Sequence, residues 1–160
     1  MGKRAEGVTV LSQLILALEN PEVDVIFVSA DIFLDGRQLP PITRTMILRG
    51  TCSDGCTLDA SGRSRHLSIG SNLDGLPGHV VLENLILRNG RITASYEVGL
   101  PSNPGGGNKK YSGRRAEYAG CKQTQGGGSI FVGDDSTLKM LDCALVNNKA
   151  ENSVRDPCAP

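Results

Sequence analysis

The feature that most constrains this sequence is a series of very short apolar segments separated by polar corners. Between residues 127 and 150, the segments Ile130–Val132, Thr137–Leu141 and Ala144–Val146 alternate with polar corners at 133–136 and 142–143. Strands of a β-sandwich usually run about 5 to 6 residues, so pieces this short do not suit that fold. Stacked β-coils use such pieces, because the backbone of each coil is paired by the next coil. The pattern predicts an all-β parallel β-helix of three to four coils.

An internal sequence repeat supports a stack of β-coils. Residues 82–90, LENLILRNG, align with residues 141–149, LDCALVNNK, at a constant offset of 59 positions, apolar on apolar and Asn89 on Asn148. A repeat of this kind indicates stacked units. Asparagine tolerates the left-handed backbone conformation and can bond its amide to an adjacent coil. We therefore expect structural corners at Asn84, Asn89, Asn147 and Asn148.

The segment also carries a family resemblance. GGSI at 127–130, followed by LVNN at 145–148, resembles the paired GG-[AS]-[IL] and F-x-x-N signatures of polymorphic outer-membrane-protein repeats, with Leu145 where that pattern prefers Phe. These repeats belong to the pectin-lyase-like right-handed β-helix superfamily. The resemblance implies a right-handed solenoid. It does not imply lyase activity, because the superfamily includes many proteins that are not enzymes.

The rest of the chain is assigned around these coils. Apolar residues at 10, 11, 14, 15 and 18 predict an amphipathic helix, with Thr9 or Ser12 as its cap and Pro21 after its end. The expected organisation is a capping helix within 1–22, β-helix coils over 23–90, a Gly-rich basic loop insertion over 91–126, a further coil over 127–150, and a tail over 151–160 without another strand. We expect the tail to continue into further coils of a longer protein.

Charge and hydropathy exclude some functions. Seventeen basic residues balance 17 acidic ones, so the sequence predicts no nucleic-acid partner. No apolar run approaches the roughly 18 residues that span a bilayer, so no transmembrane segment is expected. This chain contains no visible signal peptide. The resemblance nevertheless favours an extracellular or cell-surface location.

The cysteines leave two interpretations open. Cys52 and Cys56 flank a three-residue turn and are candidates for a disulfide if the protein is exported. A zinc site would need a second pair of ligands at a suitable spacing, which the sequence lacks. We therefore predict neither a metal nor another cofactor.

Catalytic residues are sparse. Asp134 and Asp135 resemble the adjacent aspartates of polygalacturonase-like members of the superfamily, but no companion Asn-x-Asp, Gly-His-Gly or Arg-x-Lys motif follows them in the expected downstream order. Inverting hydrolysis needs two carboxylates roughly 6.5 to 9.5 Å apart across the scissile bond. A solvated turn explains the pair more simply, so we do not assign a catalytic set.

Three functional hypotheses follow. The first is a non-catalytic β-helix scaffold or adhesion-type module that binds a polysaccharide or a cell-surface protein. Its candidate ligand-binding residues are the basic side chains of the insertion, Lys109, Lys110, Arg114 and Arg115. The alternatives are a polysaccharide-degrading enzyme of the pectin lyase or polygalacturonase type, and a fragment without independent activity.

Overall fold

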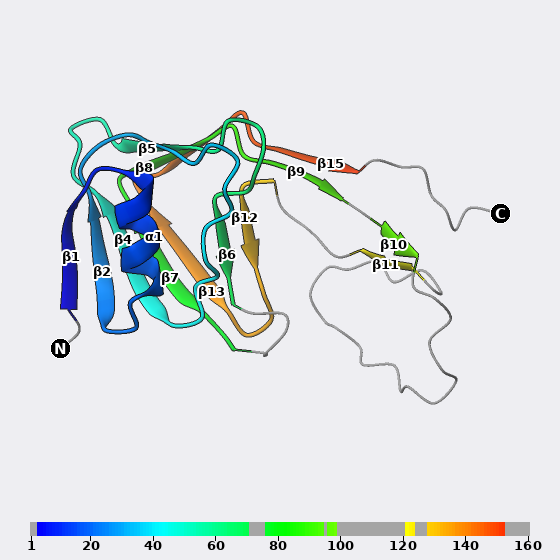
Figure 1. The fold of residues 1–160 in the computed structure, drawn as a ribbon, viewed down its shortest axis with the longest axis horizontal. Helices are drawn as coiled ribbons and strands as arrows, with labels where there is room; N and C mark the ends of the chain where they lie inside the picture. Colours follow the sequence, from blue (N-terminus) through cyan, green and yellow to red (C-terminus); the bar gives the residue numbers. More distant parts are fainter. Residues whose placement is uncertain (1–2, 71–75, 95, 99–120, 124–127, 153–160) are drawn as a thin grey trace.

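The computed structural model describes residues 3–70, 76–94, 96–98, 121–123 and 128–152, and in these residues it consists mostly of strands in parallel sheets (Figure 1). The first half contains β1 (Lys3–Val8), α1 (Leu11–Glu19), β2 (Val23–Val28), β3 (Ile32–Phe33), β4 (Thr45–Gly50), β5 (Cys56–Asp59), β6 (Leu67–Ile69) and β7 (His79–Glu83). The second half contains β8 (Leu85–Arg88), β9 (Arg91–Ala94), β10 (Tyr96–Val98), β11 (Cys121–Gln123), β12 (Ile130–Val132), β13 (Thr137–Leu141), β14 (Ala144–Val146) and β15 (Lys149–Asn152).

The strands form two larger sheets and three strand pairs. A five-stranded parallel sheet has the order β1-β2-β4-β7-β13, and a four-stranded parallel sheet has the order β14-β8-β5-β3. The pairs β6–β12 and β9–β15 are parallel, whereas β10–β11 is antiparallel. Along the chain, β4, β5 and β6 enter the five-stranded sheet, the four-stranded sheet and the β6–β12 pair in turn, and β7 then returns to the first sheet.

The core consists of apolar side chains that stack from strand to strand. Across the five-stranded sheet, the paired residues Ile26, Leu48, Leu82 and Met140 form one such row. Across the four-stranded sheet, Ile32, Leu58, Leu87 and Leu145 form another. The first three members of each row are buried, at about 1.5 to 3 kcal/mol of stabilisation for each large aliphatic side chain. Aliphatic residues dominate because they fill a narrow space between pleated faces.

The last member of each row is less covered. Met140 is half-buried, and the side chain of Leu145 is 55% exposed. The cause is geometric, because β13 and β14 each pair on one side only within the described part of the chain. The apolar rows therefore end at a face that other side chains only partly cover.

The predicted N-terminal helix is present, but its setting differs from the prediction. β1 precedes α1 and pairs with β2, so the helix lies between two parallel strands instead of ahead of the first one. Leu14, Ala17 and Leu18 are buried. The prediction that Thr9 or Ser12 caps the helix is wrong: Val10 is the N-cap residue and forms no side-chain cap. The Thr9 N–H instead donates to Gln13 Oε1 at 2.9 Å.

The internal repeat pairs in parallel as expected, but in a different register. The structure pairs Thr137 with His79, an offset of 58 positions in place of 59. Because side chains alternate between the two faces of a strand, this one-residue shift puts Leu141 on the outward face beside Glu83. The sequence alignment superposed apolar residues, whereas the structure superposes the residues with left-handed backbone conformation, Asn84 with Asp142 and Asn89 with Asn147.

Those corners are the asparagines that the sequence indicated. Asn84, Asn89 and Asn147 have φ values of 51°, 57° and 54°, the left-handed region that asparagine tolerates. Asp142, with φ 50°, occupies the corner that corresponds to Asn84. The Asn84 amide donates to Gly50 O at 3.1 Å and to Cys52 O at 2.8 Å, so one side chain joins two neighbouring turns. Asn148 is not among the left-handed residues and acts through its side chain alone.

Two predicted boundaries are corrected. Residues 91–126 were expected to be a loop insertion, but β9 begins at Arg91, and β10 and β11 also fall in this range. The tail 151–160 was expected to contain no strand, but β15 continues to Asn152 and pairs with β9. The pattern Lys-Ala-Glu-Asn lacks the apolar residues on which the strand assignment relied.

We predict that Asn84→Gly destabilises the protein by about 2 kcal/mol, because it removes two hydrogen bonds worth about 1 kcal/mol each while glycine keeps the left-handed backbone free of strain. Asn147→Gly is the matched control: it has a similar φ, but its side chain makes no hydrogen bond within the described residues, so its effect is expected within about 0.5 kcal/mol. Urea unfolding measures both. Equal destabilisation would contradict the role assigned to the Asn84 amide.

Candidate functional site

A polar groove lies where β5, β8 and β14 end and where β9 and β15 begin. It has a volume of about 630 Å³. Its lining combines one carboxylate, two cations and several amides from three successive passages of the chain: Asp59, Asn89, Arg91, Asn147, Asn148 and Lys149, with glycine and serine between them. Parallel pairing brings these residues together, because the ends of adjacent parallel strands meet at one edge of the sheet.

Asp59 forms one wall of the groove and is held in place. Its Oδ1 accepts the Ser61 N–H at 2.7 Å. The Asn89 amide donates to both carboxylate oxygens, at 3.1 and 3.0 Å. Three of the roughly four acceptor positions of a carboxylate are therefore used inside the protein. Asp59 positions the corner at Asn89 and keeps a small remaining capacity to accept a hydrogen bond from a ligand.

The two asparagines from the last turn have different roles. Asn148 donates to Leu87 O at 2.9 Å and accepts the Gly90 N–H at 2.6 Å, so both ends of its amide bind the preceding passage of the chain. Asn147 is exposed, and its side chain makes no hydrogen bond within the described residues. Asn148 is thus structural, whereas the Asn147 amide can serve a ligand with both a donor and an acceptor.

A buried histidine lies close to Gly90, one of the residues that line the groove. His66 is fully buried, with Nε2 at 2.9 Å from Arg88 O and Nδ1 at 2.9 Å from Ser129 Oγ. A carbonyl oxygen can only accept, so Nε2 carries the proton and Nδ1 accepts from the serine hydroxyl. Burial lowers the pKa of His66 below its usual 6.5, because a charged ring would lose its hydration. A ligand cannot reach this Ser–His pair.

Close packing in this region explains Gly128 and Ser129 of the GGSI segment. A Cβ on Gly90 would lie 2.8 Å from His66 Cε1, and a Cβ on Gly128 would lie 2.2 Å from Lys149 O. Ser129 O accepts the His66 N–H at 2.8 Å. Glycine at 128 and serine at 129 are therefore required by space and by hydrogen bonding.

The rim of the groove is basic. Arg91 and Lys149 are paired in register on β9 and β15, and both are exposed. Like charges directly opposite each other on adjacent strands repel. Together with Asp59 they leave the groove with a formal charge of about +1 when Asp59 is ionised. The groove thus offers hydroxyl-binding amides beside cationic groups.

An exposed aromatic ring lies beside the groove. Phe33 is 66% exposed and pairs in register with Asp59, which pairs in turn with Arg88. Adjacent strands lie about 4.8 Å apart, so the ring is one strand away from the groove wall. Phe33 and the groove residue Asp59 therefore lie opposite each other on adjacent strands of the four-stranded sheet.

The structure places the other predicted site residues elsewhere. Asp134 and Asp135 lie in an exposed turn between β12 and β13, and neither lines the groove. The turn is stabilised locally, because Ser136 Oγ donates to Asp134 O at 3.3 Å and Asp135 has φ 57°. Lys109, Lys110, Arg114 and Arg115 lie outside the described residues.

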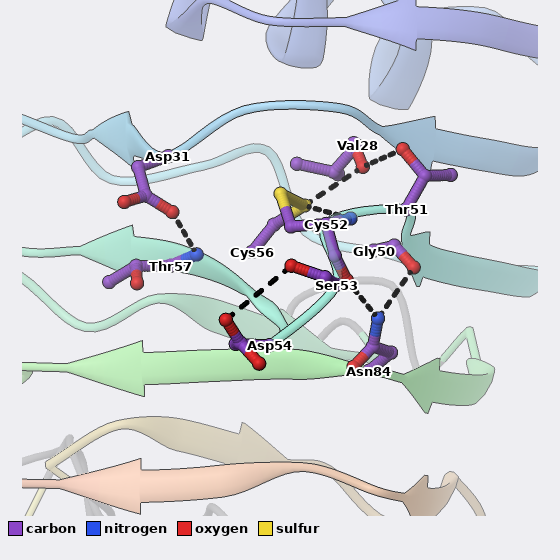
Figure 2. The surroundings of a disulfide bond; sticks show 10 residues. All are labelled: Val28, Asp31, Gly50, Thr51, Cys52, Ser53, Asp54, Cys56, Thr57 and Asn84. Carbon is purple, nitrogen blue, oxygen red and sulfur yellow. Dashed lines mark hydrogen bonds between the residues drawn. A yellow bond between two sulfur atoms is a disulfide. The ribbon is translucent and has the colours of Figure 1, made fainter.

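Cys52 and Cys56 form a disulfide in the turn between β4 and β5 (Figure 2). Their Cα atoms are 5.1 Å apart, within the range for such bonds. The turn is anchored on both sides: Asn84 donates to Cys52 O, and Thr51 Oγ1 donates to Val28 O at 3.1 Å. The disulfide therefore closes a turn that already contacts two neighbouring passages.

The sequence reasoning missed most of the groove. It identified Asn89, Asn147 and Asn148 as corners but did not see that Asp59, Arg91 and Phe33 accompany them. One signal was available, since Asp59, like Asn147, directly follows an apolar residue of a short strand segment. The spacing between paired residues differs from one passage to the next, however: Cys56 of β5 pairs with Leu85 of β8, 29 positions later, whereas Ile86 of β8 pairs with Ala144 of β14, 58 positions later. Without the pairing, these residues cannot be aligned.

Comparison with known protein families, with curated proteins and with solved structures finds no match for this chain. Across the described ranges, no helix is long and apolar enough to cross a membrane. The same residues hold no cluster of three or more His, Cys, Asp or Glu side chains able to bind a metal ion. Inference about function therefore starts from the groove and its surroundings.

We predict that reducing the Cys52–Cys56 disulfide destabilises the protein by about 2 kcal/mol, the loop-closure value for a loop of about five residues. Thermal unfolding with and without a phosphine reductant measures this loss. A Cys52→Ser/Cys56→Ser double variant is the control, and its melting temperature should not respond to the reductant. An equal response in the control would assign the effect to other cysteines.

We also predict that acid destabilises the fold through His66. Its folded pKa lies below its unfolded value, so its contribution is complete above about pH 6.5 and is lost as the pH falls, with a slope of up to about 1.4 kcal/mol per pH unit. Urea unfolding between pH 7.5 and 5.5 should show this slope in the native chain and a smaller one in His66→Gln. His79→Gln, at an exposed histidine, is the control and should retain the slope.

Proposed function

We propose that this chain is a right-handed parallel β-helix that acts as a non-catalytic, glycan-binding scaffold. The repeated order of strands through the same sheets supports the β-helix, and parallel strands joined by a crossover are right-handed in about 98% of cases. The observation that carries the binding function is the surface formed by Phe33 and the polar groove.

The chemistry of this surface suits a sugar chain. A sugar ring has an apolar face, which an exposed aromatic ring can cover, and a rim of hydroxyl groups that both donate and accept hydrogen bonds. Phe33 supplies the first element. The exposed Asn147 amide, the remaining acceptor capacity of Asp59 and the ammonium of Lys149 supply the second. Because these groups follow successive strands, the surface can accommodate an extended ligand.

A binding role fits the groove better than hydrolysis does. Among the described residues that line the groove, Asp59 is the only carboxylate, and it already accepts three hydrogen bonds. Glycoside hydrolysis uses a pair of carboxylates that flank the scissile bond. Asp134 and Asp135 do not line this groove. We therefore favour the hypothesis of a non-catalytic binding scaffold over that of a polysaccharide-degrading enzyme.

The disulfide supports an extracellular or cell-surface location as part of this proposal. Disulfides persist in oxidising compartments and are rare where thiols are kept reduced. Cys52 and Cys56 are bonded directly to each other in a compact turn. A glycan-binding scaffold outside the cell would meet its ligand in the same environment.

We expect the chain to bind a subset of glycans on an array, and we expect Phe33→Ala to weaken this binding about tenfold, equivalent to about 1.4 kcal/mol. Leu16→Ala is the matched control, because Leu16 is similarly exposed but lies on α1. Its affinity should not change.

A second arm compares two possible binding sites. Asn147→Ala/Lys149→Ala removes the ligand-facing groups of the groove, whereas alanine at positions 109, 110, 114 and 115 removes the basic cluster expected from the sequence. The proposal predicts loss of binding for the first variant. Binding lost with the second variant but retained with the first and with Phe33→Ala would place the site in the basic cluster.

A further inference from the structure

The face where the apolar rows end exposes apolar side chains that the groove does not use. It contains the last member of each inward row, with Leu138 and Met140 on β13, Leu145 on β14, and Ile130 and Val132 on β12. Their row partners Leu67, Ile69, Val80, Leu82 and Leu87 are all buried. We call this surface the end face.

The end face also has free backbone groups. β12, β13 and β14 each pair on one side only within the described ranges, so their other edges present N–H and C=O groups that can pair with a further strand. Apolar side chains beside an open strand edge favour a partner that supplies a strand together with apolar side chains. A small ligand supplies neither.

Another edge of the molecule also combines an open strand edge with apolar side chains. β1 lies at the opposite edge of the five-stranded sheet and is likewise paired on one side only in the described part. Its Ala5 packs inward against the core. The helix that follows, α1, has exposed apolar side chains at its N-cap residue, Val10, and at Leu16. This surface, β1 with α1, is called the start face.

The charges on the two faces are complementary. The turn before β13 is acidic, with Asp134 and Asp135 both exposed. β1 begins with exposed Lys3 and Arg4, of which Lys3 also forms an ion pair with Glu22 of its own chain. Parallel pairing of β13 with β1 of another copy puts these two strand starts side by side. With Leu138 opposite Ala5, both inward positions stay aligned, and Lys139 lies opposite Glu6.

An antiparallel contact between two end faces lacks this match. It would bring the start of one β13, next to Asp135, against the end of the other, next to Asp142. These are like charges and would repel. Charge therefore favours joining the end face to a start face over joining two end faces.

We infer that the end face binds the start face of a second copy of this chain, so that β13 of one copy pairs in parallel with β1 of the next. In this arrangement α1 of the second copy covers the exposed apolar residues of β12 and β14. Because the two faces are different, the contact is heterologous. Since β1 and β13 are opposite edges of the same sheet, the contact repeats along the direction of strand pairing and produces linear assemblies.

Sedimentation velocity of the full chain over a range of concentrations tests this inference. The expected result is a mass that rises with concentration beyond the dimer, with elongated particles by negative-stain electron microscopy. A monomer at every concentration would overturn the inference. So would a closed dimer whose mass stops at two copies.

Charge reversal provides a stricter test, because recovery of assembly in a mixture of two variants shows that both variants are folded; circular dichroism of each variant alone checks the same point. Asp134→Lys/Asp135→Lys should abolish assembly, because two basic faces then meet, and Lys3→Glu/Arg4→Glu should abolish it because two acidic faces meet. An equimolar mixture should regain assembly, since each face then finds an oppositely charged partner. Failure of the mixture to assemble, or assembly of either variant alone, would contradict the proposed pairing.

The apolar part of the contact has its own matched pair of variants. Leu145→Glu puts a charge in the inward row of the end face and should abolish assembly. Val146→Glu puts the same charge on the adjacent outward position, beside Arg88, and should leave assembly unchanged. Equal effects of the two variants would show that the inward row does not form the contact.

Discussion

The structure depends on the pairing of each short strand with the strand one passage earlier. A strand of three to five residues buries too little surface to be stable alone, and its backbone groups must be satisfied by neighbours. The left-handed corners make this pairing possible, because they turn the chain within one residue and keep successive strands at the same level. Asn84 illustrates the mechanism: its backbone makes the turn, and its amide binds carbonyl groups in the passage below. Every row of the core follows from these corners.

The groove is a by-product of the same geometry. Where corners stack, polar side chains accumulate at one edge of the four-stranded sheet, and part of their hydrogen-bonding capacity is used to hold the stack. Asn148 and most of Asp59 are used in this way, whereas Asn147 and Lys149 are exposed. The division explains why residues of the same type have different roles. A ligand interacts with the side chains that the stack does not need.

Strand type, parallel pairing and asparagine corners could be predicted from this sequence because each depends on a local pattern. The register could not be predicted. Matching the apolar residues of LENLILRN and LDCALVNN gives an offset of 59 positions, whereas the left-handed corners of the structure are 58 positions apart. β1 was missed since Lys-Arg-Ala-Glu-Gly-Val lacks an apolar alternation, and it becomes a strand through pairing with β2. β15 was missed for the same reason. The groove needed contacts between residues about 30 and 60 positions apart, which depend on spacings that vary between passages.

The meeting of Gly90 with Gly128 has a consequence for how this chain can vary. A Cβ on Gly90 would lie 2.7 Å from Gly128 O, so positions 90 and 128 touch although 37 residues separate them in the sequence. The closure entropy of such an excursion grows only with the logarithm of its length, about 0.6 kcal/mol for each doubling. Lengthening the sequence between β9 and Gly128 therefore changes little in the stacked strands. Insertions between positions 90 and 128 are therefore expected to be tolerated without changes in the packing of the core.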